Sequence, residues 1–323
     1  MRRVPILLCT ALALASAGLA AAAPAAPVRA KAVVAMPVAD HHQYVFSPAA
    51  AAFMSTATAA LRPVTAQELI PQLDAAGIER AAVLSVAYVY GQPLRSLDEE
   101  YRRVRAENDW AARQAAEYPD RLVALCSVDP LKKYALAELA RCAANPEFGR
   151  GIKLQPAAGG IVLDDEAQVD QVRRVFRSAN ARGMTILLQL RGTGAEQARL
   201  LIEQLLPHAP DVPVQVAYTG EADDSPQQAA LAVLADAAAR QDPRMRQVWF
   251  DVTAFARPGL SQADARHLVR RMRQVGMDRV LYGSDTVIGA DQRPQEAWAA
   301  FRNLPLTDAE AARVASNVMS YLR

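Results

Sequence analysis

Eight short apolar segments alternate with helix-like segments along the chain, and this alternation constrains the fold more than any other feature. Strands that alternate with helices are typical of βα units in a parallel sheet. Eight such units in 323 residues predict one α/β domain, a (β/α)8 TIM barrel over residues 30–323, with an open doubly wound sheet as the alternative. The expected strands are 81–87, 122–128, 151–154, 184–190, 214–217, 248–252 and 279–282, after a first strand that begins with the apolar run 33–36.

Helix signals separate these strands. Thr65 with Glu68, and Ser96 with Glu99, have the spacing of a capping box, in which two side chains satisfy the free amides of a helix start. Residues 49–62 are rich in alanine and are expected to form a long loop, with room for a short helix, over the mouth of the site. The helices are predicted at 65–76, 96–118, 134–144, 169–183, 195–206, 226–240, 261–275, 294–302 and 307–321.

The N-terminus has the composition of a secretory signal peptide. Arg2 and Arg3 precede an uncharged apolar run at 4–19, and small residues at 20–26 offer cleavage sites. We predict that residues 1–25 are removed and that the protein is secreted, to a bacterial periplasm. An uncleaved membrane anchor is the alternative, which the shortness of the run disfavours.

Charge and composition limit the partners. The formal net charge is +2, and two arginines lie in the predicted signal peptide. Without a basic patch or an acidic tail, the sequence gives no reason to propose nucleic acid as a partner. The expected partner is a small-molecule substrate, with no membrane association after signal cleavage and with a homo-oligomer as an option.

Two cysteines, Cys126 and Cys142, belong to the predicted mature chain. Export would permit a disulfide between them, but we favour two buried free thiols. Their spacing is not typical of a zinc site.

The polar stretch Asp-His-His-Gln-Tyr closes the expected first strand. Because side chains alternate between the two faces of a strand, we expect Asp40, His42 and Tyr44 on one face and His41 and Gln43 on the other.

Polar residues also follow the other expected strands, and in a barrel the carboxyl ends of the strands carry function. Burying such groups is costly unless they pair or bind a ligand, so a ligand site is favoured over an internal salt-bridge network. These residues are Tyr88 and Tyr90, Ser127 and Asp129, Lys153 and Gln155, Gln189 and Arg191, Tyr218 and Glu221, Asp251 and Thr253, and Ser284 and Asp285.

Several segments, in order, resemble the amidohydrolase superfamily, in particular its amidohydrolase-related branch of hydrolases and decarboxylases. Residues 40–44 resemble its opening Asp-x-His-x-His, and residues 151–156 resemble its Gly-x-Lys-Leu-His-Pro segment. Residues 283–285 match its eighth-strand Gly-Ser-Asp, and residues 317–322 are similar to its closing helix. The resemblance covers nearly all of the mature chain.

The departures from the family pattern bear on the chemistry. Tyr44, Gln189 and Tyr218 stand where the family has histidines, and Gln155 replaces another common histidine. A catalytic zinc needs about three protein ligands plus water. Only His42 and Asp285 remain of the family's metal ligands. We therefore expect no cofactor, and a divalent metal such as zinc on a rebuilt ligand set that includes a tyrosine is the open alternative.

The resemblance then implies an exported hydrolase that cleaves an ester, lactone or amide bond of a small anionic carboxylate substrate. Asp285 would be the general base on a water, and His42 and Lys153 would complete the catalytic set. Two alternatives stay open: a catalytically inactive protein of this fold that binds a small carboxylate, and a decarboxylase of the same branch. The expected substrate-binding residues are Arg191, Tyr44, Gln189, Tyr218, Gln155 and Tyr88.

Overall fold

The structure, a computed structural model, describes residues 36–91, 97–155, 161–162, 164–189, 194–217, 226–251, 260–286 and 293–323. The predicted signal peptide, residues 1–25, lies outside the described residues, as do Arg191, Tyr218, Glu221 and Thr253. Within the described ranges, no helix combines the length and the apolar character needed to span a membrane.

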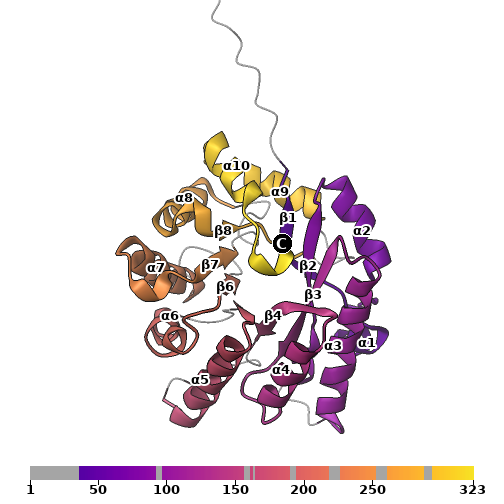
Figure 1. Cartoon of the computed structure of the whole chain (residues 1–323). Coiled ribbons are helices and arrows are strands. Elements are labelled where there is room, and N and C mark those ends of the chain that lie inside the picture. Colours follow the sequence, from indigo (N-terminus) through magenta and orange to yellow (C-terminus); the bar gives the residue numbers. More distant parts are fainter. Residues whose placement is uncertain are drawn as a thin grey trace, which may run out of the picture. The chain divides into compact units, whose positions relative to one another are not determined.

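Eight strands form one parallel sheet in the order of the sequence, which confirms the predicted (β/α)8 barrel (Figure 1). The first and last strands complete the ring: His41 N donates to Tyr282 O at 2.9 Å, and Asp285 N donates to His42 O at 3.0 Å. The strands are β1 (Ala39–Tyr44), β2 (Arg80–Leu84), β3 (Leu122–Val128), β4 (Phe148–Leu154), β5 (Thr185–Gln189), β6 (Val214–Ala217), β7 (Val248–Asp251) and β8 (Val280–Leu281).

Strand β1 is the polar stretch itself. The run 33–36 was expected to begin this strand, but Met36, its one described residue, lies outside it. Asp40 pairs with Ala81 and Gln43 with Val83, so β1 has one more residue than β2 over the same length. This extra residue is a β-bulge, which breaks the two-residue alternation of side chains.

The bulge makes the predicted faces of β1 wrong for Asp40 and Gln43, whereas His42 and Tyr44 lie together as predicted. Gln43 Nε2 donates to Asp40 Oδ2 at 2.7 Å, so these two side chains lie together. His42 Nε2 lies 2.8 Å from the Tyr44 hydroxyl, so those two form a separate pair. Asp40 therefore does not join His42 and Tyr44, because the inserted residue changes the face on which each side chain emerges.

The helices pack around the outside of the strands (Figure 1). Their bounds are α1 (Pro48–Met54), α2 (Ala66–Ala75), α3 (Glu100–Ala116), α4 (Ala135–Ala144), α5 (Glu166–Ala181), α6 (Ala195–Leu200), α7 (Pro226–Ala239), α8 (Gln262–Val275), α9 (Pro294–Arg302) and α10 (Asp308–Ser316). A π-helical segment, Leu201–Leu205, continues α6.

The helix starts test the two capping boxes. Thr65 and Glu68 form the reciprocal bonds of a capping box at the start of α2, as predicted. The second prediction was wrong in its position: α3 begins at Glu100 and its cap residue is Glu99, with a φ of 57° and no side-chain cap bond. Ser96 lies outside the described residues.

The chain ends in a short segment at the amino end of the barrel rather than in a long helix. The predicted helix 307–321 stops at Ser316, because Asn317 turns its side chain to donate to Met277 O and Val280 O, each at 2.7 Å. A 3-10 helix, η7 (Ser320–Leu322), then contacts β2 and β4 and lies across the amino end of the ring of strands (Figure 1). Arg80 Nη1 donates to Leu322 O at 2.5 Å and holds this end in place.

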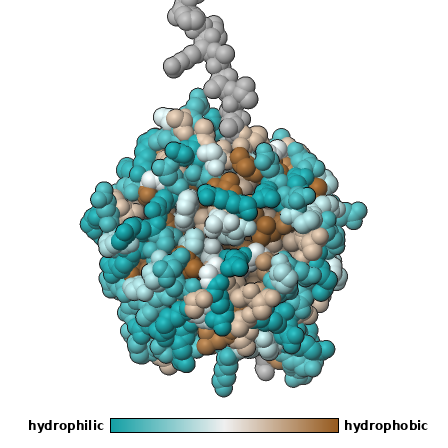
Figure 2. All heavy atoms as spheres, in the orientation of Figure 1, coloured by the Kyte–Doolittle hydropathy of each residue, from teal (hydrophilic) through white to brown (hydrophobic). Residues whose placement is uncertain are grey.

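Two apolar clusters stabilise this arrangement. Residues such as Val83, Ile152 and Val214 belong to the cluster that packs strands against helices. Leu84, Leu187 and Leu281 belong to the second cluster, together with residues of η7. The face of the barrel that shows η7 carries hydrophilic side chains over much of its rim (Figure 2).

Cys126 of β3 and Cys142 of α4 form a disulfide, with Cα atoms 6.2 Å apart. Our preference for two free thiols was wrong. Both positions are buried, and the packing of α4 against β3 brings them within bonding reach, which their spacing of 16 residues does not reveal.

Candidate active site

His42 lies at the centre of the polar strand ends. Its Nδ1 atom is 2.6 Å from Asp251 Oδ2. Its Nε2 atom is 2.8 Å from the Tyr44 hydroxyl and 3.3 Å from Asp285 Oδ1. The structure thus brings together residues of β1, β7 and the segment after β8, which the ring closure makes neighbours.

Asp251 is the residue that sequence reasoning missed as a site residue. It was noted only as one of several polar strand ends, yet its buried carboxylate accepts from His42 Nδ1. A carboxylate at Nδ1 keeps the proton there, which leaves Nε2 as the nitrogen that faces the reacting groups. The only sequence signal was its place at the end of the seventh strand.

Hydrogen bonds from the next layer of side chains position Asp251. Gln215 Nε2 donates to Asp251 Oδ2 at 3.2 Å, and the hydroxyl of Tyr321 donates to Gln215 Oε1 at 2.5 Å. The chain of contacts therefore runs from the C-terminal segment through β6 and β7 to His42. Such outer contacts fix the orientation of a functional imidazole.

Lys153 is fully buried and donates to the Tyr44 hydroxyl at 2.7 Å. Its ammonium also lies 4.5 Å from the centre of the Tyr44 ring and 5.1 Å from that of Tyr88. Burial, and next the charge of Asp285, raise the pKa of Tyr44 well above its usual value. Tyr44 is thus a neutral hydroxyl that accepts from Lys153 and keeps its own proton to donate toward His42 or Asp285.

Gly283 and Asp285 give the site its close packing. A Cβ at position 283 would lie 2.5 Å from Asp251 Oδ1 and 2.8 Å from His42 Cβ, so only glycine fits between them. Asp285 has a φ of 49°, a left-handed conformation that costs about 1 kcal/mol or more for a residue other than glycine. This turn directs its carboxylate at His42 Nε2, and 20% of its side chain stays exposed.

Gln155 directly follows β4 and Gln189 is the last residue of the neighbouring β5, with 8% and 4% of their surface exposed. Within the described part of the chain, the Oε1 atom of each has no hydrogen-bond partner. Tyr88 is half-buried beside Lys153. Of the predicted substrate-binding residues, Arg191 and Tyr218 lie outside the described residues.

The remaining polar residues of β1 are structural. Asp40 accepts from the amides of His42 and Ser284 at 3.0 and 2.9 Å, and burial raises the pKa of its carboxyl to about 6. His41 Nδ1 donates to Tyr282 O at 2.7 Å, and its Nε2 accepts from Met319 N at 3.1 Å. Burial lowers the pKa of His41 to about 4, so the ring is neutral at pH 7.

The residues at the strand ends do not fit a divalent metal. His42 and Asp285 are the family-type ligands present, but His42 Nδ1 is taken by Asp251, and the ammonium of Lys153 lies 2.7 Å from the Tyr44 hydroxyl. A cation held by Tyr44 would face that ammonium at close range, which is unfavourable in a buried site. In the described ranges, the one cluster of three potential ligands is Cys126, Glu138 and Cys142, and its cysteines are joined as a disulfide.

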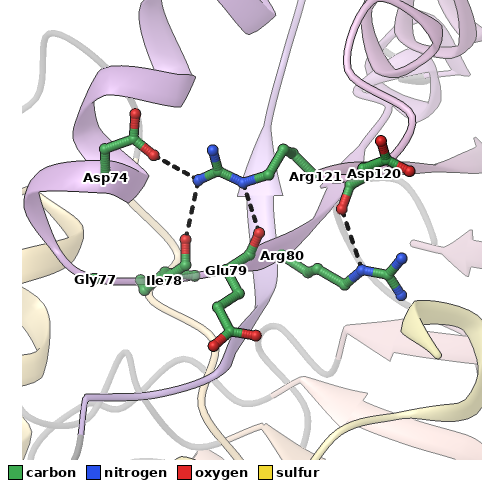
Figure 3. A pocket seen from close by; sticks show the side chains of 7 residues that line it. All are labelled: Asp74, Gly77, Ile78, Glu79, Arg80, Asp120 and Arg121. Carbon is green, nitrogen blue, oxygen red and sulfur yellow. Dashed lines mark hydrogen bonds and ion pairs between the residues drawn. The ribbon is translucent and has the colours of Figure 1, made fainter.

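A shallow pocket lies at the opposite end of the strands (Figure 3). The guanidinium groups of its two arginines already have hydrogen-bond partners. Its lining includes Arg80 and Arg121, at the amino ends of β2 and β3. Arg121 donates to Glu79 O and Asp74 Oδ1 at 2.7 and 2.6 Å, and Arg80 donates to Asp120 O at 3.2 Å. These guanidinium groups hold backbone turns together.

The comparisons with known proteins agree with the fold. The family model described as Amidohydrolase matches residues 29–317, so this chain belongs to the amidohydrolase family and to its amidohydrolase-2 branch. No curated protein matches the chain.

Solved structures of the same branch match nearly the whole chain. A 5-carboxyvanillate decarboxylase from Sphingomonas paucimobilis is 14% identical, with a TM-score of 0.59 over 87% of this chain and 96% of that one. A probable 2-pyrone-4,6-dicarboxylic acid hydrolase from Acinetobacter baumannii, with citric acid bound, is 18% identical, with a TM-score of 0.57 over 86% and 96%. A 2,6-dihydroxybenzoate decarboxylase from Rhizobium is 15% identical, with a TM-score of 0.56 over 87% and 96%. At these identities the likeness shows the fold, and the neighbours include both a hydrolase and decarboxylases.

Proposed function

We propose that this protein is a hydrolase that cleaves an ester, lactone or amide bond of a small carboxylate substrate, with Asp285 as the general base. The observation that carries the proposal is the position of Asp285, the more exposed of the two carboxylates on His42, directly against Nε2. The names of the structural neighbours, a dicarboxylic acid hydrolase and decarboxylases of aromatic carboxylates, support a carboxylate as the substrate class.

The reaction needs a base, an oxyanion donor and a proton for the leaving group. Asp285 takes a proton from a water as its oxygen bonds to the substrate carbonyl carbon. Tyr44 and Lys153 are the donors that stabilise the negative charge which develops on the carbonyl oxygen. As the carbon–oxygen or carbon–nitrogen bond breaks, the proton returns to the leaving group through Asp285 or through His42 at 3.3 Å.

Decarboxylation is the second candidate, because the same His42 could protonate the carbanion that the loss of carbon dioxide leaves. Asp251 Oδ2, 2.6 Å from His42 Nδ1, orients the imidazole so that Nε2 faces the substrate side. The two candidates share the fold and the substrate class, and they differ in the product.

Asp285→Asn tests the mechanism. We expect it to lower the turnover of carboxylate-bearing esters and lactones by at least about a hundredfold, since a general base contributes 10²–10⁴-fold. The matched control is Asp308→Asn, whose carboxylate is 73% exposed on the surface, and it should keep full activity. Hydrolysis that survives in Asp285→Asn would refute the base.

Product analysis separates the remaining functions. Release of carbon dioxide from an aromatic carboxylate would assign the decarboxylase. Binding of carboxylates without turnover of any screened substrate would assign a catalytically inactive binding protein.

We further propose that residues 1–25 direct export to the periplasm. The support is the sequence of basic, apolar and small residues at the N-terminus. Mass spectrometry of the protein from a periplasmic fraction should find a chain that begins near residue 26, and a full-length chain in the cytoplasm would contradict it.

A further inference from the structure

Gln155 and Gln189 form a feature that the proposed mechanism does not use. Leu154 of β4 pairs with Leu188 of β5. Gln155 and Gln189 directly follow these two residues, so they are neighbours across the two strands. Both side chains are more than nine-tenths buried, and each leaves its Oε1 atom unpaired among the described residues. Two adjacent strand ends thus present two adjacent unpaired acceptors.

An unpaired buried acceptor is unfavourable, because it has lost its water without gaining a partner. Other buried glutamines of this chain avoid this: Gln215 and Gln114 use both ends of their amides. In the described ranges, the other unpaired buried atoms belong to side chains on the outer helices, namely Trp110, Gln197, Trp298 and Arg302. Among the residues that the structure describes, only the two glutamines combine an unpaired buried acceptor with a place at the carboxyl ends of the strands.

We propose that Gln155 and Gln189 form an acceptor pair that binds an O–H or N–H group of the substrate. Lys153 of β4 precedes Gln155 by two residues, so the Cα atoms of the two residues lie about 7 Å apart along the chain. The ligand class is then a small carboxylate that carries a hydroxyl or amino group at its far end. The carboxylate end rests on the proposed function, and the donor end rests on the two glutamines.

Binding of matched ring acids to the full mature chain tests the pair. The probes are 4-hydroxybenzoate, benzoate and 4-methoxybenzoate, measured by calorimetry. We expect 4-hydroxybenzoate to bind about tenfold or more tightly than the other two, because a buried group that loses its hydrogen-bond partner is penalised strongly. The methoxy acid has a similar oxygen without a proton, so it separates hydrogen-bond donation from size.

Gln155→Met and Gln189→Met should each reduce this preference to below about threefold, since methionine has nearly the same length and no strong acceptor. Equal affinity for the hydroxy and methoxy acids, or no binding of 4-hydroxybenzoate, would overturn the acceptor pair.

A second measurement needs no ligand. Replacing an unpaired buried acceptor by an apolar side chain should leave the melting temperature of the free protein unchanged or raise it. Gln215→Met is the matched control and should lower it, because it removes the partners of Asp251 and Tyr321. A fall in Gln155→Met and Gln189→Met as large as in Gln215→Met would show that their amides are structurally paired, against the proposal.

Ligand binding and melting temperature test the acceptor pair independently of the proposed hydrolase activity, because neither measurement follows bond cleavage. A preference for the hydroxy acid in a protein without hydrolysis would keep the acceptor pair and remove the hydrolase. Hydrolysis by a protein that shows no preference for the hydroxy acid would keep the hydrolase and remove the acceptor pair.

Discussion

Two histidines that adjoin in the sequence differ in function because their partners differ. His41 lies between a backbone carbonyl and a backbone amide, and burial lowers its pKa so that the ring is neutral. His42 lies between two carboxylates and a tyrosine hydroxyl, so both of its ring nitrogens contact polar side chains instead of the backbone. Residue type alone assigns neither role, since the contacts of each ring decide it.

The opposed pKa shifts of His41 and Asp40 predict how stability depends on pH. The pKa of His41 falls from 6.5 to about 4 on folding, so its stabilisation is complete above pH 6.5 and is lost as pH falls toward 4. The pKa of Asp40 rises from 3.8 to about 6, so its stabilisation is present below pH 3.8 and is lost as pH rises through 6. Each shift corresponds to roughly 3 kcal/mol, so the two largely cancel between pH 4 and 6.

Asp40→Asn removes one half of this cancellation. The free energy of unfolding, measured with denaturant from pH 7 to pH 4.5, should fall more steeply with acid in Asp40→Asn than in the wild type. Asp278→Asn, a surface carboxylate that is 72% exposed, is the control and should keep the wild-type slope. If the unfolding free energy of Asp40→Asn and of the wild type changed with pH in parallel, the raised pKa of Asp40 would be contradicted.

At the scale of elements, the meeting of β8 with β1 builds the site. The bulge in β1 sends His42 and Tyr44 to one pair of contacts and Asp40 and Gln43 to another. Gly283 lets the chain after β8 approach closely enough for Asp251 to reach His42. The site therefore depends on one inserted residue and one missing side chain.

Gly283→Ala should disturb the contact between Asp251 and His42. Its Cβ would lie 2.5 Å from Asp251 Oδ1, which forces a shift and costs about 1–3 kcal/mol of stability. Nitrogen NMR of the labelled histidines, of which the chain has four, should show a changed proton distribution on His42.

Gly276→Ala is the control for backbone effects. Gly276 has a φ of 94° with nothing within 4 Å of an added Cβ, so it should lose about 1 kcal/mol of stability without changing the His42 signal. An unchanged His42 signal in Gly283→Ala would show that the close approach does not position Asp251.

The disulfide between β3 and α4 makes a prediction of its own. It closes a loop with a sequence separation of 16, so its reduction should cost about 3 kcal/mol of unfolding free energy. Because both cysteines are buried, reduction should be done in the unfolded chain before refolding. The control is the Cys126→Ala, Cys142→Ala double variant, whose melting temperature should not respond to reductant. A wild type whose melting temperature is the same before and after reduction would contradict the disulfide.

At the scale of the whole molecule, the sequence predicts the barrel because burial patterns are local. Each apolar strand and each amphipathic helix is visible in its own segment, and the eight strands follow in order. Contacts between distant segments were not visible. Asp129, Asp251 and Asp285 all follow strands in the sequence, and only the pairing across β7, β8 and β1 shows which carboxylates reach His42. The bulge and the disulfide were missed for the same reason.

The C-terminus links the far end of the barrel to the site, and Tyr321→Phe tests that link. Tyr321 is buried in η7, and its hydroxyl donates to Gln215, which donates to Asp251. The variant leaves Gln215 Oε1 unpaired, so stability should fall by about 1–3 kcal/mol. Because the Gln215 amide can then rotate away from Asp251, the His42 NMR signal should change as well.

Tyr282→Phe is the matched control: it also loses one buried bond, to Pro294 O at 2.7 Å, but it should leave the His42 signal unchanged. Equal effects of the two variants on His42 would mean that the C-terminal segment supports the barrel without positioning the site.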